Sequence, residues 1–247
     1  MQAMLTHTRM ELRLFFREVI GLFFVFVMPA VSFYFFGKLF GAQQYGNLSY
    51  FEQYIPGMIG IILFTAGFFI IGLQAVIDRE KGVYKRLKGT PLKPSYVFQA
   101  IVAKGFFAVF AGAVEIVLIA KFVFGAPVTD HIFQFILSLV FAAVTFFSLG
   151  FVVASIAKRF QSAMAIGFVA MYPMMFLSGA TIPLDTLPSG LQTVSMFIPL
   201  KYAIHLMQNG WTGQLFTSSS VTDAFVLAGI LIACVTIGIK FFRWDNE

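Results

Sequence analysis

The chain has 247 residues, of which 59% are hydrophobic and only 11% are charged. Soluble domains average roughly 45–50% apolar and about 25% charged residues, and a soluble fold of this length could not bury so much apolar surface. The single cysteine, Cys234, excludes a disulfide scaffold, and the widely spaced His7, His131 and His205 form no zinc-binding pattern with it. The composition therefore indicates a polytopic membrane protein.

Six stretches are apolar over roughly 18 residues or more, which is the length that a membrane-spanning helix needs. In chain order they are Val19–Phe40, Ile55–Ile77, Val97–Phe124, Ile132–Ala157, Ala163–Pro183 and Ala224–Phe242. Their apolar character is continuous, whereas strands of a membrane barrel alternate polar and apolar residues over about ten positions. The sequence therefore predicts an all-α fold with six transmembrane helices.

Residues 1–18 predict an amphipathic helix that lies on the membrane surface before the first span. Apolar residues fall near one face and arginines repeat every four positions on another, namely Leu5, Leu12, Phe15 and Phe16 against Arg9, Arg13 and Arg17. The alternative is an extended first helix with a basic flank. A cleavable signal peptide is disfavoured because the first apolar stretch is longer than the hydrophobic region of a signal peptide and because eighteen residues precede it.

The basic residues are unevenly divided between the two sides of the predicted spans, and most of the 17 fall on one side. That side carries Arg9, Arg13, Arg17, Arg79, Lys81, Lys85, Arg86, Lys88, Lys93, Lys158, Arg159, Lys240 and Arg243. The positive-inside rule then places both termini in the cytoplasm. The net charge of +6 reflects this bias, so no nucleic-acid partner is expected.

The connection between the second and third spans, residues 78–94, is the most distinctive segment. Pro91 and Pro94 close a stretch long enough for about three helical turns, with Gly82 as a weak point. Such a short, charged, semi-apolar helix suits docking to a cytoplasmic partner. The residues equally suit a basic loop that touches anionic lipid headgroups.

The stretch 184–222 before the last span is semi-apolar and interrupted by prolines. Pro188 and Pro199 exclude one continuous helix, so short re-entrant or interfacial helices are expected, with Tyr202 and Trp211 as headgroup-level anchors. An ordinary loop resting on the bilayer is the alternative.

Glu115 is the acidic residue that lies well inside a predicted span, the third. An ionisable group there is costly and should face the bundle interior or a partner. It predicts either a polar group on a translocation path or a structural pair, and a slightly shifted helix would let it reach the interface near Lys121.

Two motifs resemble type-2 ABC exporter permeases, the ABC-2 type. The first, which follows the second span as in that family, is Glu80-x-Gly82-x-x-Lys85-Arg86-Leu87-x-x-Thr90-Pro91-Leu92. The second ends the fifth span and continues outward as Phe176-Leu177-Ser178-Gly179-x-x-Ile182-Pro183, Leu187-Pro188, Leu191-Gln192 and Pro199-Leu200-x-Tyr202. Together with the six spans and the N-terminal helix, the resemblance covers nearly the whole chain. Many relatives carry an acidic residue at the position of Lys85.

The resemblance implies a single permease domain over residues 1–247 whose cytoplasmic segment seats against a separate ABC ATPase. The residues it assigns to this coupling are Asp78, Arg79, Glu80, Gly82, Lys85, Arg86, Leu87, Thr90 and Pro91. No Gly-x-x-x-x-Gly-Lys-Ser/Thr loop occurs, so the chain should be no enzyme and bind no cofactor; ATP and Mg²⁺ are expected on the ATPase. A second permease copy, in a homodimer, completes the expected assembly.

The expected function is the export of a lipophilic or amphipathic cargo, such as a drug, antibiotic, peptide or lipid, across a bacterial plasma membrane. An ion-coupled secondary transporter or channel is the main alternative, but Glu115 is the one intramembrane polar group that stands out and no internal repeat appears. A membrane-embedded hydrolase is disfavoured because no histidine accompanies the serines of the spans: His7 and His131 lie outside the predicted spans, and His205 lies in the stretch before the last one.

Overall fold

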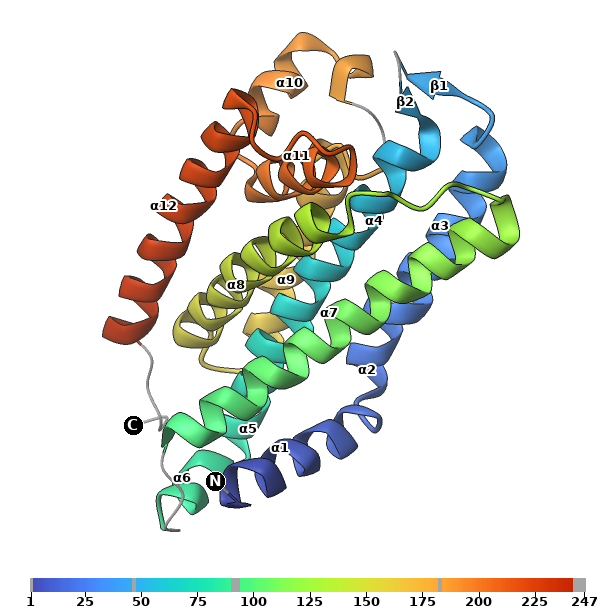
Figure 1. Ribbon diagram of the computed structural model, residues 1–247. Coiled ribbons are helices and arrows are strands. Elements are labelled where there is room, and N and C mark those ends of the chain that lie inside the picture. The colour runs from blue at the N-terminus through green and yellow to red at the C-terminus, as the bar shows by residue number, and fades with distance from the viewer. Residues whose placement is uncertain (1, 46–47, 90–93, 182–183, 242–247) are drawn as a thin grey trace.

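The computed structural model describes residues 2–45, 48–89, 94–181 and 184–241, and it is a bundle of helices with one very short hairpin (Figure 1). Within these residues, 6 helices are long and apolar enough to cross a membrane. They are Val19–Phe40, Tyr50–Glu80, Tyr96–Phe124, Ile132–Ile156, Phe160–Leu177 and Ser218–Lys240. The predicted all-α architecture with six spans is confirmed.

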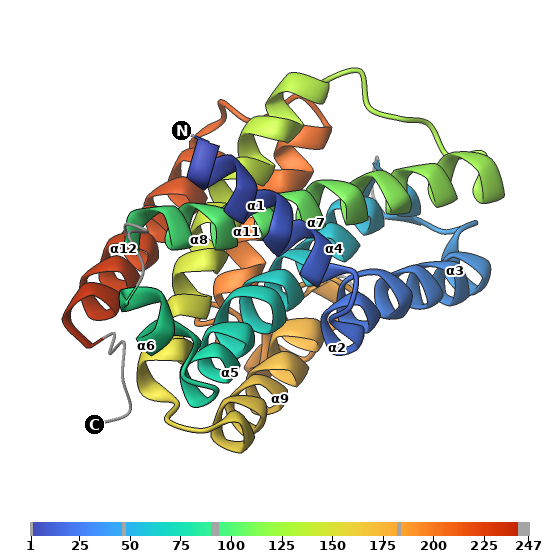
Figure 2. The same cartoon turned by 90° about the horizontal axis from the view of Figure 1, so that it is seen from below.

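The N-terminal helix α1 (Gln2–Phe15) lies across the lower end of the bundle and packs on α7 (Pro94–Phe124) (Figures 1 and 2). Phe15 is fully buried, whereas Phe16 is 63% exposed, so only one of the two phenylalanines belongs to the packed face. The arginines that repeat every four residues are exposed. The predicted helix is therefore present as far as Phe15, which packs on protein, while Phe16 stays exposed.

The first span consists of three consecutive segments: α2 (Val19–Leu22), the π-helical η1 (Phe23–Val27) and α3 (Met28–Phe40). Pro29 is the second residue of α3, two positions after Val27, at which the π-helical turn ends. A proline cannot donate a backbone hydrogen bond, and both prolines and π-bulges are places where helices bend. After α3, strands β1 (Gln44–Tyr45) and β2 (Leu48–Ser49) pair antiparallel.

The second span is the central helix of the bundle and runs through α4 (Tyr50–Thr65), η2 (Ala66–Leu73) and α5 (Gln74–Glu80). Its apolar part is almost entirely buried by its neighbours, which agrees with the absence of charged residues from Ile55 to Ile77. It begins five residues before the predicted Ile55 because Ser49 and Glu52 form a capping box: the Ser49 hydroxyl accepts from the Glu52 amide, and Glu52 accepts from the Ser49 amide.

The central helix packs most closely on α8 (Ile132–Ile156), where two glycines face each other. A Cβ atom added at Gly67 would lie 2.5 Å from the carbonyl oxygen of Phe146, and one added at Gly150 would overlap the carbonyl oxygen of Gly67. Only glycine permits this approach, which is how helices commonly associate closely inside a membrane.

The fifth span, α9 (Phe160–Leu177), ends before the predicted Pro183, which with Ile182 lies outside the described residues. Gly179 has φ of +83°, a left-handed conformation that stops a helix. The following stretch forms η3 (Leu184–Thr186), α10 (Ser189–Ser195) and α11 (Pro199–Trp211), in line with the expected short helices. The stretch predicted to run to residue 222 ends earlier, because the last span, α12 (Ser218–Phe241), begins before that residue.

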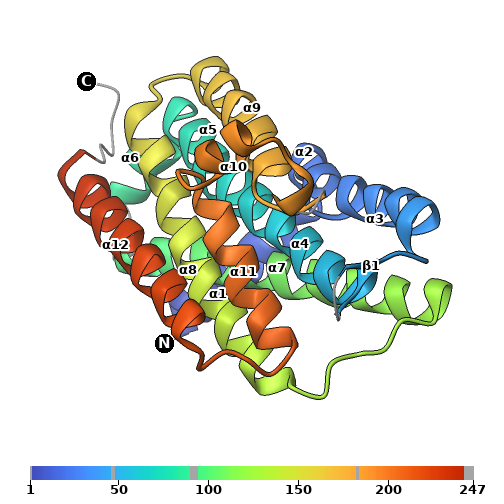
Figure 3. The ribbon, with the colours of Figure 1, turned by 90° about the horizontal axis from the view of Figure 1, so that it is seen from above.

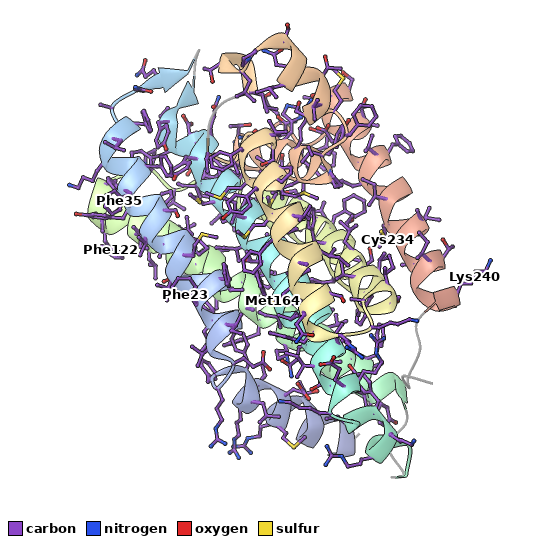
Figure 4. All side chains as sticks on the ribbon, turned by 180° about the vertical axis from the view of Figure 1, so that it is seen from behind. Phe23, Phe35, Phe122, Met164, Cys234 and Lys240 are labelled. Carbon is purple, nitrogen blue, oxygen red and sulfur yellow. The ribbon has the colours of Figure 1, made fainter. Side chains whose placement is uncertain are left out.

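Trp211 does not serve as a headgroup anchor. Its side chain is 4% exposed, and its ring packs edge-on against Phe135 with ring centroids 5.0 Å apart. Outward-facing phenylalanines are found elsewhere: Phe35 on α3 and Phe122 on α7 lie on the outer edge of the bundle (Figure 4). Such residues suit contact with lipid chains.

Candidate coupling site

The segment predicted to couple the permease to an ATPase is split into two helices. Helix α5 ends at Glu80, Gly82 adopts φ of +65°, and α6 (Val83–Lys88) follows in a new direction beside α5 (Figure 2). The predicted weak point at Gly82 is thus a full break, because a left-handed residue cannot continue a right-handed helix. Thr90 and Pro91 lie outside the described residues, as does the side chain of Leu87.

Arg79 points into the bundle rather than toward a partner. Its side chain is 6% exposed, its Nη1 donates to the Ala154 carbonyl oxygen at 2.8 Å, and its Nη2 donates to that of Ala157. These carbonyls belong to the last turn of α8 and the residue after it, which have no partner within their own helix. The guanidinium therefore caps the end of α8 and complements the negative end of its dipole.

Glu80, the next residue, makes the complementary contact with α9. Its Oε1 accepts a hydrogen bond from the Phe160 backbone amide at 3.0 Å, at the first residue of that helix. A carboxylate at a helix N-terminus satisfies an otherwise unpaired amide and is favoured by the helix dipole. We call Arg79 and Glu80, with these backbone partners, the Arg79–Glu80 clamp, because it fastens the end of the central helix to both α8 and α9.

The remaining predicted coupling residues divide between the inside and the surface. Asp78 is half-buried, and its Oδ1 accepts from Gln74 Nε2 at 3.0 Å within α5. Tyr84 on α6 is buried, which raises the pKa of its hydroxyl. Lys85 and Arg86 are exposed, and Arg86 Nη2 also donates to the Lys81 carbonyl oxygen at 3.0 Å. Helix α6 therefore presents the cations of Lys85 and Arg86 at the surface, while its Tyr84 packs against the bundle.

A buried ion cluster that the sequence reasoning missed joins α1 to α7. Lys104 has no exposed side-chain surface; its Nζ lies 3.2 Å from Glu11 Oε2 and 2.9 Å from Glu18 Oε1. Burial raises the pKa of the Glu18 carboxyl, while the neighbouring Lys104 acts in the opposite direction. A lysine inside a predicted span needs an acidic partner, so the position of Lys104 in the sequence was the available signal. We call these three residues the Lys104 cluster.

Glu115 lies in the middle of α7 and is half-buried. Its buried Oε2 has no hydrogen-bond partner among the described residues, and no ion pair joins it to Lys121 within them. The structure therefore does not bring Glu115 together with the coupling residues. A partly buried carboxyl with an unsatisfied oxygen is energetically costly in this position.

Comparisons with known proteins assign the family. The model of the family described as ABC-2 type transporter matches residues 2–211. A protein of Cyanophora paradoxa that carries the name transport permease ycf38 is 29% identical over 220 residues, covering 82% of this chain and 72% of that protein. The inner membrane transport permease YhhJ of Escherichia coli is 24% identical over 140 residues, 56% of this chain and 37% of that protein.

Nodulation protein J of Rhizobium leguminosarum bv. trifolii is 34% identical over 97 residues, 39% of this chain and 34% of that protein. The matched parts thus span about a third of the lengths of YhhJ (37%) and nodulation protein J (34%). The family match, by contrast, extends from α1 through α11 and includes the central helix, the Arg79–Glu80 clamp and the Lys104 cluster. The chain therefore belongs to the ABC-2 type transporter family, as a transport permease.

Proposed function

We propose that this permease is the membrane-spanning subunit of an ATP-driven exporter that works as a homodimer with separate ATPase subunits. The observation that supports this most is the Arg79–Glu80 clamp. Because the clamp fastens α5 to α8 and α9, a displacement of the neighbouring α6 would reach three spans through short polar contacts. A flexible loop at this place would dissipate the same displacement.

In this mechanism ATP and Mg²⁺ bind to the ATPase subunits, whose closure pushes the segment 78–92. Lys85 and Arg86, exposed on α6, would pair with acidic groups of the ATPase, and Leu87 would fill a groove on it. Glu80 would keep α9 attached while α5 tilts, so that the path between the two permeases opens outward.

The proposed orientation places α1, α6 and the end of α12 on the cytoplasmic side of a bacterial plasma membrane, as the distribution of basic residues indicates. The cargo is a lipophilic or amphipathic compound, in keeping with the Phe- and Met-rich interior of the spans. Two relatives from Escherichia coli are named as probable multidrug ABC transporter permeases, which supports a cargo of this class.

The experiment is purification of the full chain from native membranes in a mild detergent, followed by an assay for ATP hydrolysis in the eluted complex. Leu87→Asp and the double variant Lys85→Glu, Arg86→Glu should abolish co-elution of the ATPase. The matched control is Arg9→Glu, Arg13→Glu, which reverses two exposed charges at the same end of the bundle. An oligomer that elutes without ATPase, or α6 variants that retain it like the control, would contradict the proposal.

An ion-coupled transporter remains the second candidate because Glu115 places an unsatisfied carboxyl oxygen inside a span. Proton coupling would require this carboxyl to gain and lose a proton during transport. Glu115→Gln should then abolish transport driven by a pH gradient in proteoliposomes without ATPase. Transport that needs ATPase and ATP and that survives Glu115→Gln removes this candidate.

A further inference from the structure

An open cavity of about 650 Å³ with polar and apolar groups in its wall lies at the end of the bundle opposite α1 and α6. It is lined by α10, α11, the start of α12 and the beginning of the central helix; α11 runs between α12 and α4 when the bundle is seen from this end (Figures 1 and 3). The cavity lies within a single chain and far from the coupling site.

Helix α11 is strongly amphipathic, and its polar face contributes polar side chains to the cavity wall. Its apolar face, which packs on α8 and α4, is buried and carries Leu200, Ala203, Ile204, Leu206, Met207 and Trp211. The opposite face lines the cavity with Lys201, His205, Gln208 and Asn209. A polar helix face that lines a cavity needs water or a polar ligand beside it, because apolar groups cannot satisfy its hydrogen bonds.

Three carboxamide side chains in the wall are oriented by hydrogen bonds that their nitrogens donate. Gln192 Nε2 donates to the Leu187 carbonyl oxygen at 2.8 Å, and Gln208 Nε2 donates to that of Gln53 at 3.1 Å. Asn209 Nδ2 donates to Ser220 Oγ at 2.8 Å.

The amide oxygens of Gln192, Gln208 and Asn209 accept no hydrogen bond from the described residues. Each amide also retains a second N–H, so each presents one acceptor and one donor in a fixed orientation. Hydroxyl groups, which both donate and accept, are the natural partners of such pairs.

Charged groups in the wall are few and of both signs. His205 Nδ1 lies 2.5 Å from Asp223 Oδ2, and this pair bridges α11 and α12. Lys201 has no carboxylate within salt-bridge distance among the described residues. A phosphate site would gather cations and a cation site would gather carboxylates, whereas among the described side chains of this wall one lysine and one aspartate balance beside one histidine. Tyr202 and Met196 add apolar surface to the wall.

From the amide pairs, the balanced charge and the adjoining apolar surface, we propose that this cavity binds a neutral polyhydroxylated group of the saccharide class. Vicinal hydroxyls would bond to the Gln192, Gln208 and Asn209 amides, and the apolar face of the ring would lie on Tyr202 and Met196. The binding chemistry is independent of the proposed export function; only the placement of the cavity on the outer side of the membrane rests on it.

The test uses the full chain purified without ATPase in an amphipol that carries no sugar. Maltose, sucrose and N-acetylglucosamine are titrated and followed by saturation-transfer difference NMR, with inorganic phosphate and choline as charged probes. At least one sugar should bind, and the charged probes should not. Because loss of one hydrogen-bonding group typically costs a few-fold in affinity, Gln192→Ala should weaken binding about fivefold.

Two further variants keep the outcome decisive. Met196→Asp replaces the apolar surface on which the sugar ring would lie with a charge, at an exposed position of the cavity wall, and should weaken binding without removing an internal hydrogen bond. Gln161→Ala removes an exposed amide at the opposite end of the bundle and should leave binding unchanged. The proposal is overturned if none of the three sugars binds, if phosphate or choline binds more tightly, or if Met196→Asp elutes like wild type and binds equally well. Because no ATPase is present, failure of the export proposal would leave this result unaffected.

Discussion

Replacing Lys104 by methionine tests whether the Lys104 cluster holds α1 against the bundle. At 2.9 and 3.2 Å, and with side-chain exposures of 0% for Lys104 and 17% and 14% for Glu18 and Glu11, the lysine is shared by two poorly solvated carboxylates. Removing one partner of a buried ion pair typically costs about 3–5 kcal/mol because the other charge is left without compensation. For a chain of this length that corresponds to a fall in Tm of about 6–20 °C.

The assay is thermal denaturation of the purified permease, followed by loss of its monodisperse elution peak. Lys121→Met, which removes an exposed lysine from the same helix, is the matched control and should leave Tm nearly unchanged. Adding Glu11→Gln and Glu18→Gln to Lys104→Met should restore much of the loss, since no charge is then stranded. A Lys104→Met variant that melts like Lys121→Met, or that the glutamine substitutions do not improve, would refute the reasoning.

Three other predictions concern single contacts. Arg79→Gln should leave the Ala154 carbonyl uncapped and lower transport while ATP hydrolysis continues, and equal loss of both activities would contradict a transmitting role for the clamp. Gly150→Ala should destabilise the fold by about 1–3 kcal/mol, because the added methyl group overpacks the contact with Gly67, and Tm should fall accordingly. The control is Gly238→Ala, where an added Cβ meets nothing within 4 Å. Glu115→Gln should raise Tm slightly because it removes a costly carboxylate; transport and expression that both stay unchanged would exclude a role in the pathway.

The spans could be predicted from the sequence because their apolar length alone marks them, and the six predicted stretches match the six helices within a few residues at most ends. The ends that differ depend on single residues whose effect is local. Glu52 extends the second span by capping with Ser49, and the left-handed Gly179 shortens the fifth. Hydropathy does not register a capping box or a φ angle.

The polar contacts were harder to predict because they join residues far apart in the chain. Arg79 lies in a motif that suggests an outward-facing role, yet its guanidinium caps a helix that ends 77 positions later, at Ile156. Lys104 was visible as a charge in a span, but its partners Glu11 and Glu18 lie 93 and 86 positions away in the chain. A single sequence gives no distance between such groups; only the packing of α1 on α7 does.

The length of the central helix explains where its contacts lie. At 1.5 Å per residue, the 31 residues from Tyr50 to Glu80 measure roughly 46 Å, whereas the hydrocarbon core of a bilayer is about 30 Å thick. Both ends of this helix must therefore project into the headgroup region or beyond, unless it is strongly tilted. Gln53, which contacts α11 through its carbonyl oxygen, lies near one end, and the Arg79–Glu80 clamp lies at the other. The clamp thus lies at one end of this helix and Gln53 near the other, so one buried helix connects the coupling end of the permease to the cavity.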